Sequence, residues 1–216
     1  MPDRVDWAEM VADAVCRRAG CSPERHATVA TVVLLAAELA REGREGRSVG
    51  TLITIGDTDT IVRRSRTLIL DPLAGHDAGA RHVGDRSFRE TVKELAQLDG
   101  AFVVDDDGTF VSAARFFEVS VAATERLPAG LGARHAAAAS ISDEADAVAI
   151  AVSESSLVRV FARGELEAEI APGPFLGGGT VAFAIEDATV HELADVGLTV
   201  ALAPDGARPA SRQPEA

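Results

Sequence analysis

The sequence predicts an α/β protein whose core is a mixed, mostly β-sheet flanked by helices. Amphipathic helical patterns open the chain, and short apolar runs rich in β-branched residues recur from residue 49 onward. Turns containing Gly and Asp separate these runs, and helical segments interrupt them. The 216 residues are 47% hydrophobic and 25% charged, which is typical of a folded globular chain.

The first two helices are predicted from spacing and capping signals. Apolar residues fall at helical intervals over residues 6–19. Ser22 then supplies an N-cap, Pro23 a first-turn proline and Glu24 a first-turn acid for a second helix. We expect this second helix to run to about Arg41.

The middle of the chain alternates between predicted strands and helices. Strands over residues 49–55 and 61–70 precede a loop over 71–84, and Asp85 or Ser87 caps the next helix. Later elements are expected in this order: a β-hairpin over 99–117, a helix over 132–145, and strands over 147–152, 158–161 and 165–170.

Glycine and proline around residues 172–179 mark a boundary near the C-terminus. We therefore divide the chain into an N-terminal helical segment over 1–24, a main domain over 25–172, a small appendage over 177–204 and a frayed tail over 205–216. The appendage is predicted as strand, helix and strand, over 180–185, 188–194 and 198–203.

The acidic balance limits the partners of the chain. Lys and Arg total 21 against 34 Asp and Glu, so the net charge is −13. This charge disfavours binding to nucleic-acid phosphates or to an anionic membrane surface. Lys93 is the only lysine. An acidic, lysine-poor composition suggests adaptation to high salt or a GC-rich genome, and the sequence does not separate the two.

The number of cysteines and the length of the apolar segments indicate where in the cell the protein is expected. Cys16 and Cys21 are the only cysteines, too few for a disulfide framework or a zinc site, so we expect buried or idle thiols. The start of the chain lacks the basic and apolar regions of a signal peptide. The most apolar stretch, Ala27 to Ala40, is too short and contains Glu38. We expect a cytoplasmic protein without membrane contact.

The first candidate site is the sequence Asp99-Gly100-Ala101. A carboxylate at the mouth of a buried strand suits a hard divalent cation, and the small residues after it leave room for a ligand against the backbone. The alternative is a helix-to-strand turn in which Asp99 caps and Gly100 bends the chain.

A second candidate site lies where a glycine-rich loop enters a helix, at Gly132-Ala133-Arg134-His135. Unpaired backbone N–H groups and a guanidinium suit a phosphate group. The alternative is a helix start with a surface arginine and a packed histidine.

Ser153 and Glu154 form a third candidate site, directly after the strand over 147–152. Polar residues at a strand end are where α/β proteins gather ligand contacts. The alternative is a polar turn without a ligand.

These three motifs, in this order, resemble the diadenylate cyclase (DAC) domain family over roughly residues 28–171. The runs Glu42–Gly46 before Gly50-Thr51-Leu52, and Phe88–Thr91 before Asp99, are most similar to the archaeal branch. Two positions depart from the family pattern. Ala133 stands where many members have Thr or Ser, and Ala136 stands where bacterial members have a second arginine.

The resemblance implies condensation of two ATP into cyclic di-AMP with release of two pyrophosphates, by two face-to-face protomers that each hold one ATP. It implies Mg²⁺ or Mn²⁺ as cofactor, with Asp99 as catalytic residue and Asp99 and Glu154 as metal ligands. It further implies these nucleotide-binding residues: Gly100, Ala101, Gly132, Ala133, Arg134, His135, Ser153 and Glu154.

Two alternatives stay open at this point. The two alanines are compatible with a regulatory module that binds ATP or cyclic di-AMP without turnover. The C-terminal appendage is compatible with a subunit that is active only when a partner docks on it.

Overall fold

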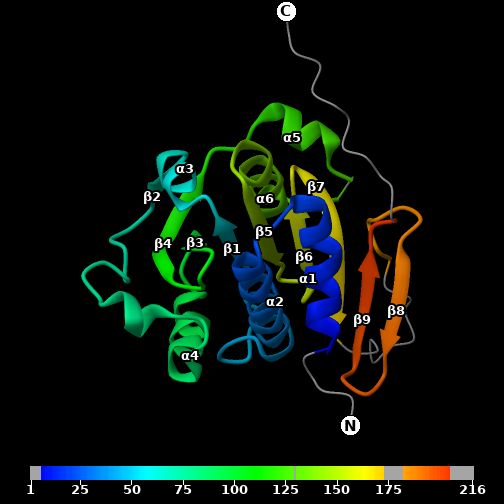
Figure 1. Cartoon of the computed structure of the whole chain (residues 1–216), viewed down its shortest axis with the longest axis horizontal. Coiled ribbons are helices and arrows are strands. Elements are labelled where there is room, and N and C mark those ends of the chain that lie inside the picture. The colour runs from blue at the N-terminus through cyan, green and yellow to red at the C-terminus, as the bar shows by residue number, and fades with distance from the viewer. Residues whose placement is uncertain (1–5, 129, 173–181, 205–216) are drawn as a thin grey trace, which may run out of the picture.

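A computed structural model describes residues 6–128, 130–172 and 182–204, which fold as helices around one β-sheet (Figure 1). The helices in chain order are α1 (Asp6–Ala19), α2 (Pro23–Glu42), α3 (Thr58–Arg63), a 3₁₀ turn (Ala78–Arg81), α4 (Arg86–Leu95), α5 (Val121–Arg126) and α6 (Ala133–Glu144). The strands are β1 (Thr51–Gly56), β2 (Ser65–Thr67), β3 (Ala101–Val104), β4 (Phe110–Phe117), β5 (Ala147–Val152), β6 (Val158–Ala162), β7 (Glu165–Pro172), β8 (Thr189–Leu193) and β9 (Leu198–Leu202).

The strands of the described residues form one nine-stranded sheet in the order β2-β4-β3-β1-β5-β6-β7-β9-β8. β1 and β3 run parallel, and every other neighbouring pair is antiparallel. This arrangement confirms the predicted fold class, a mixed sheet flanked by helices.

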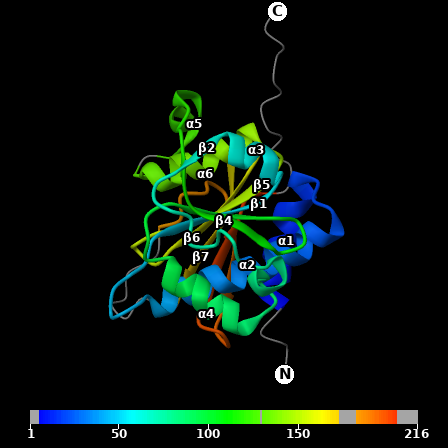
Figure 2. The same ribbon diagram turned by 90° about the vertical axis from the view of Figure 1, so that its left-hand side faces the viewer.

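Helices cover both faces of the sheet, as Figure 2 shows, with α1 on one side and α6 on the other. The alternation of side chains along each strand separates two apolar layers. Ile53 and Ile55 of β1 pack with residues of α1, α2 and α4. Leu52 lies on the opposite face, in the layer that contains residues of α3, α5 and α6. The core is therefore split by the sheet.

One predicted strand in the first half of the chain is wrong. Residues 61–70 were expected to be extended, but α3 includes Ile61, and only Ser65–Thr67 form a strand. The side chain of Asp57 accepts a hydrogen bond from the Thr60 backbone N–H at 3.1 Å, so a helix cap precedes the segment. A short capped helix thus replaces part of the predicted strand.

The C-terminal appendage also differs from the prediction. Residues 188–194, expected to be a helix, include strand β8, which forms a hairpin with β9. β9 pairs with β7, so the hairpin extends the main sheet (Figure 1). In the other predicted strand, residues 182–185 belong to no strand, and 180–181 lie outside the described residues. The predicted tail over 205–216 also lies outside them.

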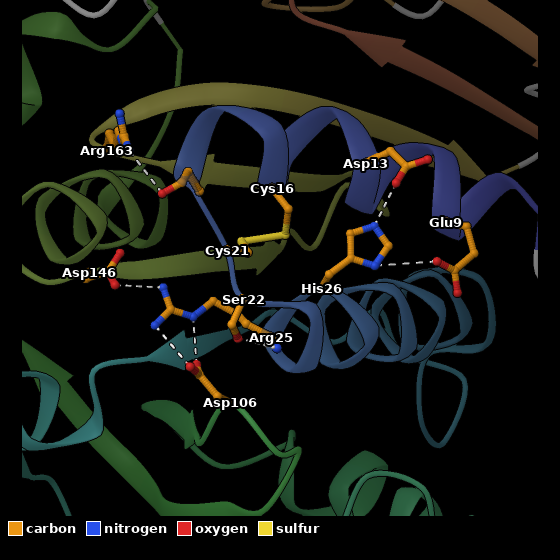
Figure 3. Close-up of a disulfide and its surroundings, with 11 residues drawn as sticks. Glu9, Asp13, Cys16, Cys21, Ser22, Arg25, His26, Asp106, Asp146 and Arg163 are labelled. Carbon is orange, nitrogen blue, oxygen red and sulfur yellow. Dashed lines mark hydrogen bonds and ion pairs between the residues drawn. A yellow bond between two sulfur atoms is a disulfide. The ribbon is translucent and has the colours of Figure 1, made fainter.

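The expectation of idle thiols is wrong, because Cys16 and Cys21 form a disulfide (Figure 3). The chain reverses at Gly20, whose φ of +74° places it in the left-handed region that favours glycine. This turn brings the two Cα atoms to 4.9 Å, within the range of disulfides. The disulfide connects the last turn of α1 to the loop before α2.

At the end of the sheet where β1 stops, ion pairs connect helices α1 and α2 to residues in or next to the sheet. Arg25 at the start of α2 lies 2.6 Å from Asp106 and 3.0 Å from Asp146 (Figure 3). Arg18 of α1 lies 2.9 Å from Glu167 of β7. Arg18 therefore joins α1 to strand β7, and Arg25 joins α2 to turns beside the sheet.

Among the described residues, no helix combines the length and the apolar character needed to cross a membrane.

Candidate functional site

Strand register brings the three predicted motifs to one end of the sheet, which we call the site end. Leu52 of β1 pairs with Ala101 of the parallel β3, so both strands begin there. Thr51 pairs with Val152 of the antiparallel β5, so β5 finishes there. The start of α6 also lies there, because the Arg134 guanidinium contacts Gly50, directly before β1. Motifs far apart in sequence therefore meet.

Asp99 lies exposed directly before β3 and has no hydrogen bond or ion pair among the described residues. Gly100 has a φ of +109°, and a Cβ placed on it would lie 2.7 Å from the carbonyl carbon of Ala114. The hairpin partner β4 therefore passes too close for any side chain at this position. Packing alone accounts for Gly100, whereas nothing in the packing accounts for the carboxylate of Asp99.

The helix before Asp99 is anchored by the only lysine of the chain. Lys93 of α4 is buried, and its Nζ lies 2.8 Å from Glu38, 3.2 Å from Glu42 and 3.1 Å from Glu90. Burial alone lowers the pKa of Lys93, but these carboxylates outweigh it and hold the pKa above its usual value. The cluster fixes α4, and hence the approach to Asp99, against the end of α2.

The start of α6 offers unpaired donors. Gly132 caps the helix without a side-chain hydrogen bond, and Ala133 is exposed. A Cβ on Gly50 would lie 2.5 Å from Arg134 Nη1, so the guanidinium lies flat against this glycine. Arg134 has no ion pair among the described residues. A cation beside free backbone N–H groups is suited to bind an anion.

His135 is buried one residue further along α6. Its Nε2 lies 3.1 Å from Nη1 of Arg159 on β6, and Arg159 Nε lies 2.7 Å from Glu169 on β7. Burial lowers the pKa of His135 to about 4, and the positive charges of Arg159 and Arg134 add to this shift. The imidazole is therefore neutral at physiological pH.

Ser153 and Glu154 follow β5 in a tight turn. The Ser153 hydroxyl donates to the Leu157 carbonyl at 3.0 Å and lies 2.7 Å from the Ser155 hydroxyl. These hydrogen bonds stabilise the turn between β5 and β6, so the Ser153 hydroxyl has a structural role. Glu154 is exposed at the tip and has no partner among the described residues.

The donor set is compatible with a divalent metal bound together with phosphate. The described residues contain no group of three or more His, Cys, Asp or Glu side chains that could hold a metal by themselves. Mg²⁺ in nucleotide sites commonly uses one or two carboxylates plus phosphate oxygens. Asp99 and Glu154 are two exposed carboxylates at the site end, which fits this kind of site.

Sequence reasoning missed three residues of this region: Gly50, Arg159 and Glu169. The run Gly50-Thr51-Leu52 was part of the family resemblance, but its contact with Arg134 depends on the fold. Arg159 and Glu169 alternate with apolar residues in their strands, a pattern that predicts exposed side chains, yet both are buried. Ala136 is buried as well, so the position of the family's second arginine faces the interior here.

Comparisons with known proteins agree on one family. Residues 38–166, more than half of the chain, match the DAC family model, described as DisA bacterial checkpoint controller nucleotide-binding. A diadenylate cyclase from Methanocaldococcus jannaschii is 46% identical over 146 residues, which cover 67% of this chain and 46% of that protein. A diadenylate cyclase from Haloferax volcanii is 40% identical over 139 residues, covering 64% of this chain and 50% of that protein.

Solved structures also resemble the chain. A hypothetical membrane spanning protein from Bacillus cereus has a TM-score of 0.47 and 20% identity, over 63% of this chain and 60% of that one. A double mutant of DacA from Staphylococcus aureus has a TM-score of 0.43 and 21% identity, over 67% of this chain and 87% of that one.

The chain spans about half the length of the two curated relatives, both of which come from archaea. The family match nevertheless includes the three motifs that the fold gathers at the site end, from Asp99 to Glu154. The chain belongs to the DAC family, and its relatives agree with the archaeal-type branch that the flanking motifs indicated.

Proposed function

We propose that this protein is a diadenylate cyclase that condenses two ATP into cyclic di-AMP and releases two pyrophosphates. The observation that carries the proposal is the meeting of Asp99, Arg134 and the free start of α6 at one end of the sheet. The relatives named diadenylate cyclase support the same activity. Because the substrate is ATP, we place the protein in the cytoplasm.

Each part of the site end takes a role in phosphoryl transfer. This reaction depends on in-line positioning and on neutralising charge more than on covalent help from the protein. Arg134 and the first backbone N–H groups of α6 hold the phosphates. Asp99 accepts the proton of the attacking 3′-hydroxyl. Gly100, Ala101, Gly132 and Ala133 leave room for the nucleotide, and Ser153 shapes the turn that presents Glu154.

Mg²⁺ or Mn²⁺, when bound, neutralises charge on the phosphates. Asp99 and Glu154 would hold it, with phosphate oxygens as the remaining ligands. Both carboxylates are exposed and have no partner among the described residues, which supports their assignment as ligands.

The product requires two ATP molecules that react with each other, so we propose that two protomers meet face to face, each with one ATP. The 3′-oxygen of one ATP then attacks the α-phosphate of the other and displaces pyrophosphate. Leu98, next to Asp99, is 39% exposed and offers apolar surface beside the site for such a contact. The net charge of −13 per chain opposes this pairing, so salt should favour it.

One observation favours a second candidate, a regulatory module that binds ATP or cyclic di-AMP without turnover. Ala133 is exposed at the start of α6 and has no hydroxyl, and buried Ala136 contributes no charge to the site. The intact Asp99 favours the cyclase.

The deciding experiment incubates the purified chain with ATP and Mg²⁺ or Mn²⁺ at low and at molar salt, followed by chromatography of the nucleotides. The cyclase should give cyclic di-AMP together with two equivalents of pyrophosphate. ATP that is bound but unconverted under every condition would contradict the cyclase and support the regulatory module. Size-exclusion chromatography with and without ATP then separates a self-sufficient dimer from a subunit that needs a partner.

A further inference from the structure

A buried chain of hydrogen bonds connects the start of α6 to the C-terminal segment. Arg159 joins His135 to Glu169, as described above. The second carboxylate oxygen of Glu169 accepts the backbone N–H groups of Ala184 and Ile185, at 2.5 and 3.0 Å. The segment before β8 lies beyond the residues matched by the family model. A part of the chain outside the family region therefore contacts the network that ends at His135.

The contact with Arg159 determines which nitrogen of His135 carries the proton. A guanidinium has only donors, so Nε2 of His135 must accept with its lone pair. The imidazole is neutral, because burial and two nearby positive charges lower the pKa of His135 to about 4. The single ring proton must then lie on Nδ1. In a free histidine, by contrast, the ring chooses its tautomer without such a constraint.

Nδ1 of His135 is buried and has no hydrogen-bond partner among the described residues. Leaving a buried donor unpaired costs about 1–3 kcal/mol. His135 follows Arg134 directly in α6, whose uncapped start is suited to phosphate. A phosphate oxygen accepts hydrogen bonds only, so it matches an N–H donor and would not match a lone pair.

We propose that Arg159 is a positioning residue of the nucleotide site, which fixes His135 as a neutral Nδ1–H donor to a phosphate oxygen of ATP. Glu169 holds the Arg159 guanidinium in this orientation, and the backbone of residues 184 and 185 holds Glu169. This inference rests on the proposed binding of ATP at the site end. In this proposal, the C-terminal segment helps to hold the nucleotide site in its binding geometry.

A role in stability alone is the competing explanation. Replacing a buried ion pair by uncharged residues is often neutral for stability, so the pair by itself does not explain why both charges are present. A purely structural pair would leave the affinity for ATP unchanged when it is replaced. The two explanations therefore differ in measurable quantities.

The test uses nitrogen-15 NMR of the histidine ring in the full chain, with and without ATP. In the wild type, His135 should carry its proton on Nδ1 and should not titrate between about pH 5 and pH 8. Addition of ATP should shift the Nδ1 signal. The variant Arg159→Met with Glu169→Gln removes both charges and keeps an acceptor for the two backbone N–H groups. In this variant the pKa of His135 should rise, because the positive charge of Arg159 is removed while burial remains, and the Kd for ATP should rise about tenfold.

The matched control is Arg163→Met. Arg163 lies in the turn between β6 and β7, and it donates to the Ala19 carbonyl at 3.1 Å instead of to His135. The control should leave the His135 tautomer and the Kd for ATP at wild-type values. Arg159→Lys, which keeps a donor, should restore part of the affinity.

A proton on Nε2 in the wild type, or titration of His135 near its usual pKa, would overturn the inference. This measurement needs no variant, so it decides even if the double variant does not fold. ATP that binds without moving the His135 signal would also overturn it, while leaving the proposed function in place. Failure of the wild type to bind ATP at all would instead overturn the proposed function together with this phosphate contact.

Discussion

The two ends of the β-sheet use the same charged residue types in different ways. Where β1 stops, Arg25 contacts Asp106 and Asp146, and these ion pairs join α2 to the turns beside the sheet. At the site end, Arg134 has no ion pair among the described residues, and Asp99 is exposed without a partner. The site end contains paired charges as well, such as Lys93 with its carboxylates and Arg159 with Glu169, but Arg134 and Asp99 stay available beside them. An available charge, more than the residue type, therefore marks the candidate site.

The largest expected effect that tests this contrast comes from Asp99→Asn. Cyclic di-AMP formation should fall about a thousandfold, because the variant cannot accept the 3′-hydroxyl proton and binds a cation weakly. The free energy of unfolding and most of the ATP affinity should stay at wild-type values. Turnover measured by chromatography checks this, with exposed Asp195→Asn in the β8–β9 turn as control. Wild-type turnover in Asp99→Asn would remove Asp99 from the catalytic site.

Arg134→Ala should weaken ATP binding about 30-fold, the loss of a charge-assisted contact to phosphate. Since Arg134 has no structural partner among the described residues, thermal stability should not change. Isothermal titration with ATP and a thermal denaturation curve provide the two measurements. Arg134→Lys should give an intermediate affinity, because an ammonium keeps the charge without the fork of donors. A loss of stability with unchanged affinity would contradict the assignment.

Arg25→Gln should show the opposite behaviour at the other end of the sheet. The free energy of unfolding should fall by about 2 kcal/mol, because two carboxylates lose their shared partner. The Kd for ATP should not change. Chemical denaturation measures the first quantity, and exposed Arg86→Gln serves as control. A variant that weakens ATP binding without losing stability would erase the distinction between the two ends.

Gly50→Ala should weaken ATP binding about fivefold. The added Cβ would lie 2.5 Å from Arg134 Nη1, so the flexible guanidinium must move while the backbone remains in place. A double-mutant cycle with Arg134→Ala checks the cause. If Gly50 acts through Arg134, Gly50→Ala should have no further effect in the Arg134→Ala background. Additive effects would show that Gly50 acts by another route.

The smallest expected effect concerns Glu167, which contacts Arg18 away from the site end. Burial raises the pKa of Glu167 to about 7, and Arg18 offsets this only in part. The folded state therefore favours the protonated acid, and its stabilisation is lost as the pH rises from about 4.5 to about 7. Glu167→Gln should remove about 1 kcal/mol of this pH dependence. Thermal denaturation at about pH 5 and pH 7.5, with Glu192→Gln as control, measures it. An unchanged pH slope would contradict the shift.

Local signals predicted much of the fold. The Ser22 cap and Pro23 correctly indicated the start of α2, and the Asp85 cap indicated α4. Errors arose where tertiary pairing overrides local preference. Residues 188–194 were expected to form a helix, yet Thr189–Leu193 pair with β9 as a strand. The Cys16–Cys21 disulfide depends on the reversal at Gly20, which a count of cysteines does not reveal.

In the candidate site, too, contiguous motifs could be predicted from the sequence, whereas contacts between distant strands could not. The three motifs were visible in the sequence because their residues are contiguous within each motif. Arg159 and Glu169 lie on separate strands, and their relation to His135 depends on the β6–β7 register, in which these two residues pair. Sequence periodicity does not show that a helix and a C-terminal segment cover that face of the sheet, so it could not reveal that both residues are buried. Contacts of this kind require the fold.

The close approach of Gly100 to Ala114 has a consequence for tracing this family through evolution. Any descendant that keeps the β3–β4 hairpin must keep this glycine, whether or not it still makes a product. Asp99 is under no such structural obligation, so a lineage that abandoned synthesis would be free to lose it. If the proposed function holds, the aspartate would distinguish a working enzyme from an inactive relative in a survey of genomes, whereas the glycine beside it reports only the shape of the hairpin.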